Sequence, residues 1–285
     1  HTVCKHYAIF PLASFSQPWR SMTNEENLNF IKSYKPQNND VENLRILLHG
    51  PVGAGKSSFI NSVESVLLGR VTGRVITDTI SESSFTKKLL KSTKTPRAFT
   101  LSFSMTPWAL SKGMEVNVED IKLALMGHVT EGYKESDQEY NSCPSLDDKV
   151  HALVCVMPAD LVSLISDEVV KKMRDVRLAA SDMGKRIPQL AILTKVDEAC
   201  PEVKNNIKNV YESIYLKEQV DKFSLMLGIP QNCIFLVKNY ESELQTNEDI
   251  NGPILIALRQ MIVYGEDFIN NLSASERSAF IILME

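Results

Sequence analysis

Cysteine and long apolar runs are scarce in this chain, and each shortage argues against one class of protein. The five cysteines among 285 residues are odd in number and include no Cys-x-x-Cys pair. That argues against a disulfide framework or a zinc site and favours reduced thiols. The longest apolar runs, such as Ala152 to Met157 and Ala279 to Met284, fall far short of the roughly 20 residues that span a bilayer. We therefore expect a cytoplasmic protein with no membrane span.

An excess of basic charge is also lacking. The formal net charge is -4, with 44% hydrophobic and 23% charged residues, close to an average globular composition. Proteins that coat nucleic acid or anionic membranes carry strong positive charge. The composition therefore gives no direct signal for either partner.

What the chain does contain is an alternation of short apolar segments with amphipathic ones. Strands are predicted at 43–49, 97–103, 148–158, 188–197 and 232–239, and helices at 24–35, 57–69, 117–129, 160–183, 203–227 and 251–269. Apolar strands without polar alternation, each separated by a helix, favour a mostly parallel sheet covered on both faces. The stretch 70–96 is expected to be the least structured, and 130–147 to be loop-like.

Three of the 12 glycines fall within six positions of the segment HGPVGAGKSS at 49–58. The string from Gly50 to Ser57 fits G-x-x-x-x-G-K-[ST] and lies between an apolar strand and an amphipathic helix, the context that this motif needs. Backbone N–H groups and the helix N-terminus would bind phosphate, the lysine would reach the terminal phosphates, and the hydroxyl would hold Mg²⁺. A chance match is the alternative, at about one per cent for this length from average residue frequencies.

The predicted phosphate-binding residues are Gly53, Ala54, Gly55, Lys56, Ser57 and Ser58, and Ser57 is also a predicted Mg²⁺ ligand. Lys56 is expected on a solvent-facing loop. The expected fold class is α/β, a three-layer P-loop NTPase domain of GTPase-like type, with a mostly parallel sheet covered by helices on both faces. We expect residues 41–270 to form this domain, 1–40 an N-terminal extension with one helix packed on it, and 271–285 a C-terminal tail.

The string Thr194-Lys195-Val196-Asp197 ends a later strand and matches the [NT]-K-x-D motif that binds guanine in P-loop GTPases. Asp197 would accept hydrogen bonds from the ring N–H and the exocyclic amine of guanine, and Lys195 would lie over the base. Adenine offers neither donor at that edge and would leave a buried carboxylate unpaired. Lys238 and Asn239 follow the last strand. They are predicted in a second base-contacting loop, with an ordinary strand exit nearly as well supported.

A GTPase also carries Asp-x-x-Gly after the strand that follows the first helix. Here Phe103 stands where the aspartate is expected and Thr106 near the glycine. Either 101–110 has diverged, or the numbering runs continuously across an altered segment. Thr86 is the best candidate for the first-switch threonine on Mg²⁺, with Thr77 and Thr79 as alternatives. No catalytic residue is assigned.

The sequence resembles the interferon-induced protein 44 family from about residue 18 to 270. The segments that carry the resemblance are PWR at 18–20, IKSYKP at 31–36, LRILLHGPVGAGKSSFINSV at 44–63, SFTKKL at 84–89 and QLAILTKVDEACPEV at 189–203. The resemblance implies a cytoplasmic, interferon-inducible, antiviral protein that binds GTP. It also implies that this chain is the C-terminal GTPase-like portion, since family members carry an N-terminal TLDc-type domain. The family pattern places Asp-Thr-x-Gly-Leu where this chain reads Phe103 to Pro107.

Two functions stay open on this basis. One is a guanine-nucleotide-binding protein that takes GTP or GDP with Mg²⁺ and hydrolyses GTP slowly. The other is a catalytically defective or nucleotide-free scaffold that acts through protein partners. Its partners are unknown, and self-association is left open. An ATP-dependent enzyme is disfavoured by Thr194 to Asp197.

Overall fold

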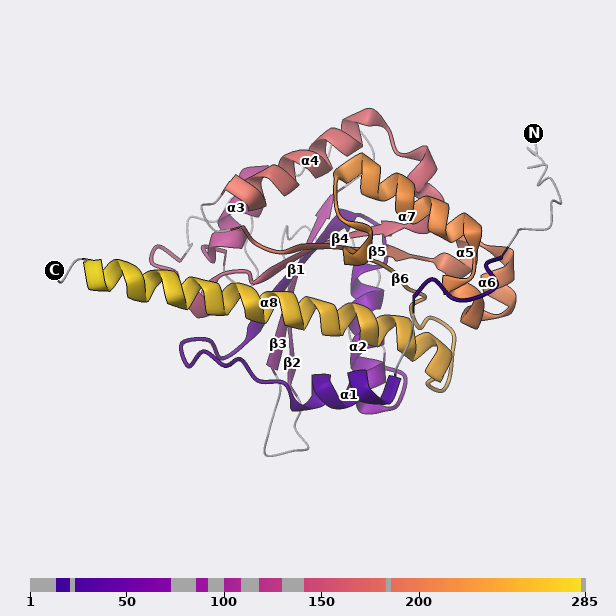
Figure 1. The fold of residues 1–285 in the computed structure, drawn as a ribbon, viewed down its shortest axis with the longest axis horizontal. Helices are drawn as coiled ribbons and strands as arrows, with labels where there is room; N and C mark the ends of the chain where they lie inside the picture. Colours follow the sequence, from indigo (N-terminus) through magenta and orange to yellow (C-terminus); the bar gives the residue numbers. More distant parts are fainter. Residues whose placement is uncertain are drawn as a thin grey trace.

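The computed structural model describes residues 14–20, 24–72, 86–91, 100–108, 118–129, 141–182 and 186–282. Its described strands form one sheet in the order β2-β3-β1-β4-β5-β6, in which only β2 runs antiparallel to its neighbour (Figure 1). The strands are β1 (Leu44–Pro51), β2 (Thr86–Lys91), β3 (Thr100–Trp108), β4 (Ala152–Pro158), β5 (Gln189–Thr194) and β6 (Ile234–Leu236).

Helices cover both faces of this sheet. The α-helices are α1 (Asn24–Ser33), α2 (Lys56–Leu68), α3 (Val118–Met126), α4 (Asp167–Asp182), α5 (Val196–Ala199), α6 (Pro201–Asn205), α7 (Ile214–Leu227) and α8 (Glu248–Ile282). Short 3-10 helices are η1 (Leu146–Asp148), η2 (Ala159–Leu164), η3 (Ile207–Tyr211) and η4 (Gln231–Cys233). Within the described ranges, no helix combines the length and the apolarity that a membrane span requires.

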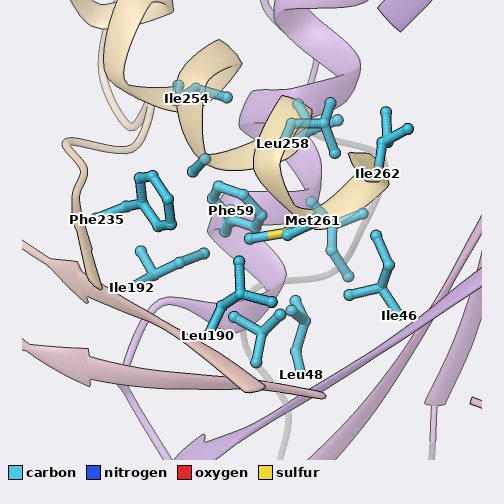
Figure 2. Close-up of a cluster of buried hydrophobic side chains, with 14 of the residues drawn as sticks. Ile46, Leu48, Phe59, Leu190, Ile192, Phe235, Ile254, Leu258, Met261 and Ile262 are labelled. Carbon is cyan, nitrogen blue, oxygen red and sulfur yellow. The ribbon is translucent and has the colours of Figure 1, made fainter. Parts of the chain in front are cut away.

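Alternate residues of the central strands enter different cores. Ile46 and Leu48 of β1 lie in a cluster with side chains of α1, α2 and α8, whereas Leu47 between them packs with α3 and α4 on the opposite face. Figure 2 shows Phe59 of α2 and Met261 of α8 in the first of these clusters. Burial on both faces explains the continuous apolar strands. The predicted three-layer α/β fold with a mostly parallel sheet is confirmed.

The strands predicted at 148–158, 188–197 and 232–239 are shorter in the structure, and three further predictions differ from it more clearly. The stretch 70–96 contains β2, a short edge strand rich in lysine whose apolar pattern is too weak to signal a strand. The helix expected over 160–183 is divided into η2 and α4, because the Ser166 hydroxyl accepts from the Val169 N–H and begins a new helix there. The last helix, α8, extends to Ile282 rather than 269. The proposed domain boundaries stay a prediction.

The N-terminal helix is attached to α8, beside which it lies in Figure 1. The Tyr34 hydroxyl donates to one oxygen of buried Glu266, and the Gln37 N–H donates to the other at 2.9 Å. Burial, together with the neighbouring carboxylate, raises the pKa of Tyr34. The shorter segment 14–20 is held near β6, where the Arg20 guanidinium lies over the Phe235 ring and donates to the Ile234 carbonyl at 2.8 Å.

A buried histidine joins the N-terminal ends of β1 and β4. His151 Nδ1 accepts from the Arg45 N–H at 2.9 Å, and Nε2 lies 3.1 Å from the Leu146 carbonyl oxygen, to which it donates in the matching neutral tautomer. Burial lowers the pKa of His151 to about 4. The protonated ring could not accept from Arg45, so the fold requires the neutral form.

We expect His151 to make the fold sensitive to mild acid. Its pKa is lower in the folded protein than in the unfolded chain, so stability is complete above about pH 6.5 and falls as the pH drops toward 4. At pH 5 this histidine costs about 2 kcal/mol of unfolding free energy. Urea unfolding at pH 7 and pH 5 should therefore show a loss that is about 2 kcal/mol smaller in His151→Gln than in the unmodified protein. Equal losses in both proteins would contradict this role.

Candidate nucleotide-binding site

Residues 50–57, which comprise the end of β1, the connecting loop and the start of α2, are called the P-loop below. Gly50, Gly53 and Gly55 all have positive φ, at 149°, 77° and 89°, a region that L side chains rarely adopt. A Cβ at Gly50 would lie 2.1 Å from the Val156 carbonyl oxygen, whereas one at Gly53 would meet no heavy atom of the described residues within 4 Å. The loop is thus packed against β4 on one side and open on the other, as a phosphate cradle requires.

Lys56 is buried and bonded to the loop itself. Its ammonium donates to the carbonyl oxygens of Gly50 at 2.7 Å and Pro51 at 2.8 Å. The expectation of a solvent-facing lysine was wrong, since only 8% of this residue is exposed. An ammonium has three N–H donors, so one remains for an oxygen of a bound phosphate. Burial lowers the pKa of Lys56 to about 8, and a phosphate beside it would favour the charged form.

The N-terminus of α2 points its first N–H groups into the same loop. Its N-cap is Gly55, and its first turn, Lys-Ser-Ser-Phe, contains no carboxylate. The helix dipole and its uncapped N–H groups therefore favour an anion here. The predicted phosphate-binding residues Gly53 to Ser58 lie together around this end of the helix.

The Thr-Lys-x-Asp motif contacts the P-loop directly. The Thr194 hydroxyl at the end of β5 donates to the Ala54 carbonyl oxygen at 2.6 Å and is fully buried. Lys195 adopts a left-handed φ of 56°, a conformation that costs a non-glycine residue energy and is concentrated at functional sites. Its ammonium lies 3.6 Å from Glu198. Asp197 follows in the first turn of α5.

Asn239, the predicted second base-loop residue, also contacts the P-loop, beside Thr194. Its side-chain N–H donates to the Gly55 carbonyl oxygen at 3.2 Å. The side-chain oxygen of Asn239 is buried and has no hydrogen-bond partner among the described residues. Buried polar atoms are rarely left unpaired in native proteins, so this oxygen is available to a ligand group. The structure thus brings the two predicted base loops and the P-loop together.

Lys238 lies between two carboxylates. Its ammonium is 3.7 Å from an Asp197 oxygen and 2.8 Å from a Glu243 oxygen. Burial alone would lower the pKa of Lys238, but the bond to Glu243 and the charges of both carboxylates raise it. Glu243 was not predicted from the sequence, because neither a motif nor a periodicity marks a loop carboxylate that pairs with a nearby lysine.

The predicted metal side of the site is less complete. Thr86 is the first residue of β2 and pairs with Met105 near the P-loop end of β3, so its backbone lies at the correct edge of the sheet. Thr77 and Thr79 fall outside the described residues. With Ser57 at the start of α2, these hydroxyls are the candidates for Mg²⁺. Among the described residues, no cluster of three His, Cys, Asp or Glu side chains could hold a metal.

The strand register corrects one expectation about β3. Gly50 pairs with Pro107 and His49 with Thr106, whereas Phe103 pairs with Ile46 three residues deeper in the sheet. A GTPase carries the aspartate of Asp-x-x-Gly beside the P-loop. In this chain, the position beside the P-loop is near Thr106 rather than Phe103. The conclusion about the motif is unchanged, because residues 100–108, TLSFSMTPW, contain no carboxylate.

Two further side chains lie below the P-loop. His49 and Cys155 pair across β1 and β4 and are both buried. Burial, with the neighbouring Lys56, lowers the pKa of His49 to about 3, and burial raises the pKa of Cys155 to about 12. His49 and Cys155 are both uncharged at neutral pH. Lys56 is therefore the charged side chain in this group of three.

A phosphate loop between β1 and α2, with a Thr-Lys-x-Asp motif at the end of β5 in contact with it, defines a GTPase-like P-loop domain. No protein-family model matches the chain. It is 31% identical over 261 residues to human interferon-induced protein 44-like, covering 87% of this chain and 57% of that protein. It is 30% identical over 258 residues to mouse interferon-induced protein 44, covering 86% of this chain and 60% of that protein.

These relatives confirm the resemblance to the interferon-induced protein 44 family. The chain spans 57% to 60% of the length of the two relatives. Among solved structures, the chain matches an ADP-ribosylation factor-like GTP-binding protein, the small COPII coat GTPase SAR1 of Encephalitozoon cuniculi in complex with GDP. It has 16% identity and a TM-score of 0.40, over 89% of this chain and 90% of that chain.

Substitution of the glycines should separate steric packing from backbone strain. Gly50→Ala places its Cβ against the Val156 carbonyl and should cost about 3 kcal/mol of stability or more. Gly53→Ala, the matched control, has positive φ without a steric clash and should cost about 1 kcal/mol. Urea unfolding of both variants measures the difference. Equal costs would show that Gly50 is not held against β4.

Proposed function

We propose that this domain binds guanine nucleotides and acts as a nucleotide-dependent protein of the interferon-induced antiviral response. The observation that carries the proposal is the pair of bonds from Thr194 and Asn239 to the P-loop. They make the phosphate-binding residues and the predicted guanine-binding residues parts of one site. Both relatives are named as interferon-induced proteins, which supports a role for this chain in the interferon response. A cytoplasmic location belongs to this proposal, and the free thiols of the four described cysteines support it.

The proposed roles follow from the contacts. P-loop N–H groups and Lys56 would bind the phosphates, and Asp197 would accept from the two N–H donors on one edge of guanine. The side chain of Asn239 is bonded to the P-loop, its backbone N–H would donate to the guanine oxygen, and its side-chain oxygen would accept from a donor of the ligand. Adenine would leave the Asp197 carboxylate without donors, which disfavours ATP.

Mg²⁺ is also part of this proposal, although few side chains of the described residues are placed to coordinate it. When bound it would neutralise phosphate charge, and Ser57, with Thr86 from β2, would hold it. The end of β3 brings no carboxylate to this side. That observation favours a second candidate, a domain that keeps nucleotide bound, or stays empty, and acts through protein partners. We therefore assign binding to the site and hydrolysis at a slow rate at most.

Calorimetric titration of GDP, a non-hydrolysable GTP analogue and ADP, with Mg²⁺, tests the proposal. We expect binding of the two guanine nucleotides and loss of at least about a hundredfold in affinity in Lys56→Ala, because a buried charge-assisted contact to phosphate is removed. Lys171→Ala, an exposed lysine of α4, is the control and should bind normally. Circular dichroism should show a folded Lys56→Ala protein. Absence of nucleotide binding to the unmodified protein would favour the scaffold.

Base selectivity provides a separate test of Asp197. Asp197→Asn presents an amide in place of the carboxylate and should weaken GDP binding at least about tenfold, because an N–H donor then faces guanine donors. The same variant should gain affinity for xanthosine diphosphate, which presents a carbonyl at that edge. Asp160→Asn, an exposed position in η2, serves as the control. Unchanged GDP affinity in Asp197→Asn would show that another residue selects the base.

A further inference from the structure

A row of alternating charges borders the candidate guanine site. Asp197 lies in the first turn of α5, whereas Lys238 and Glu243 lie in the segment between β6 and α8. Each is about a quarter exposed, with side-chain exposures of 25%, 24% and 22%. Glu243 is held in place at the end of this row, because its second oxygen accepts the backbone N–H groups of Glu241 at 2.9 Å and Ser242 at 3.2 Å. Its other oxygen faces Lys238.

Lys238 is not shared equally between its two partners. Its ammonium lies at hydrogen-bonding distance from Glu243, 2.8 Å, but at 3.7 Å from Asp197. A separation of 3.7 Å is beyond a hydrogen bond, while the charge attraction persists. Asp197 therefore has a cation nearby that does not occupy its acceptor oxygens.

We propose that Glu243 is a positioning residue of the guanine site, which holds Lys238 away from Asp197 so that both carboxylate oxygens accept from guanine. This inference rests on the proposed function. Guanine offers two kinds of donor at this edge, the ring N–H and the exocyclic amine, and a carboxylate pairs well with both only if the lone pairs of its two oxygens that face the base are free and correctly oriented. Lysine has a flexible four-carbon stem, so without the Glu243 charge its ammonium would close on Asp197.

Inosine diphosphate isolates this effect, because hypoxanthine has the ring N–H but lacks the exocyclic amine. We would titrate GDP and IDP into the unmodified protein, Glu243→Gln, Glu241→Gln and the double variant Lys238→Met/Glu243→Gln. Glu241 is an exposed carboxylate two residues away, so Glu241→Gln is the matched control. The unmodified protein should prefer GDP over IDP by about tenfold or more, the value of one hydrogen bond to a charged group.

In Glu243→Gln this preference should fall to about threefold or less, since Lys238 then takes one oxygen of Asp197. Glu241→Gln should keep the full preference. The double variant should regain it, because no ammonium is left to compete, and a purely structural role of Glu243 would not produce this recovery. Lys238→Met alone should also keep the preference, which preserves the test if Glu243→Gln does not fold.

The outcomes are distinguishable. An unchanged GDP to IDP ratio in folded Glu243→Gln, no recovery in the double variant, or a lower ratio in Lys238→Met would each overturn the role of Glu243 and leave guanine binding intact. If the unmodified protein binds neither nucleotide, the proposed function and this inference fail together.

Discussion

Side-chain hydrogen bonds to the carbonyl groups of the P-loop are the interaction on which the candidate site depends. The pairs are Lys56 with Gly50 and Pro51, Thr194 with Ala54, and Asn239 with Gly55. In a peptide unit the N–H points opposite to the C=O. The bonded carbonyls therefore turn the N–H groups of their peptide units toward the side where phosphate would bind, except at Pro51, which has no N–H. The cradle is thus formed before a ligand arrives, which reduces the ordering cost of binding.

The same preorganisation extends to the base side of the site. The Tyr240 N–H donates to the Ser62 hydroxyl of α2 at 2.9 Å, and the Tyr240 hydroxyl donates to the Asn251 side chain of α8 at 2.8 Å. Tyr240, which directly follows Lys238 and Asn239, is consequently fixed between two helices that pack on the same face of the sheet. This attachment restricts where the neighbouring Lys238 can lie relative to Asp197.

The sequence was most informative where one residue type is required by backbone geometry or by repeated burial. Gly50 and Gly55 have positive φ and close neighbours, so only glycine fits, and the motif was visible without a structure. The continuous apolar strands predicted the buried parallel sheet for the same reason. By contrast, the bond between Asn239 and Gly55 joins residues 184 positions apart, and the burial of Lys56 depends on how the loop folds around its ammonium. The sequence motif records neither feature.

The register between β1 and β3 shows why binding and hydrolysis are separable in this fold. The residues proposed to contact phosphate and base lie at the ends of β1 and β5, at the start of α2 and in the segment after β6, and the described bonds that join them come from these elements. The groups that sense the terminal phosphate in GTPases follow β3 and precede β2, at the edge of the sheet. β3 pairs with Gly50 and Pro51 through the backbone, so a change of side chains in 100–108 can leave the described side-chain bonds to the P-loop carbonyls in place. A protein of this kind can therefore lose metal-assisted chemistry and still retain the geometry that binds a nucleotide, since the two depend on different strands.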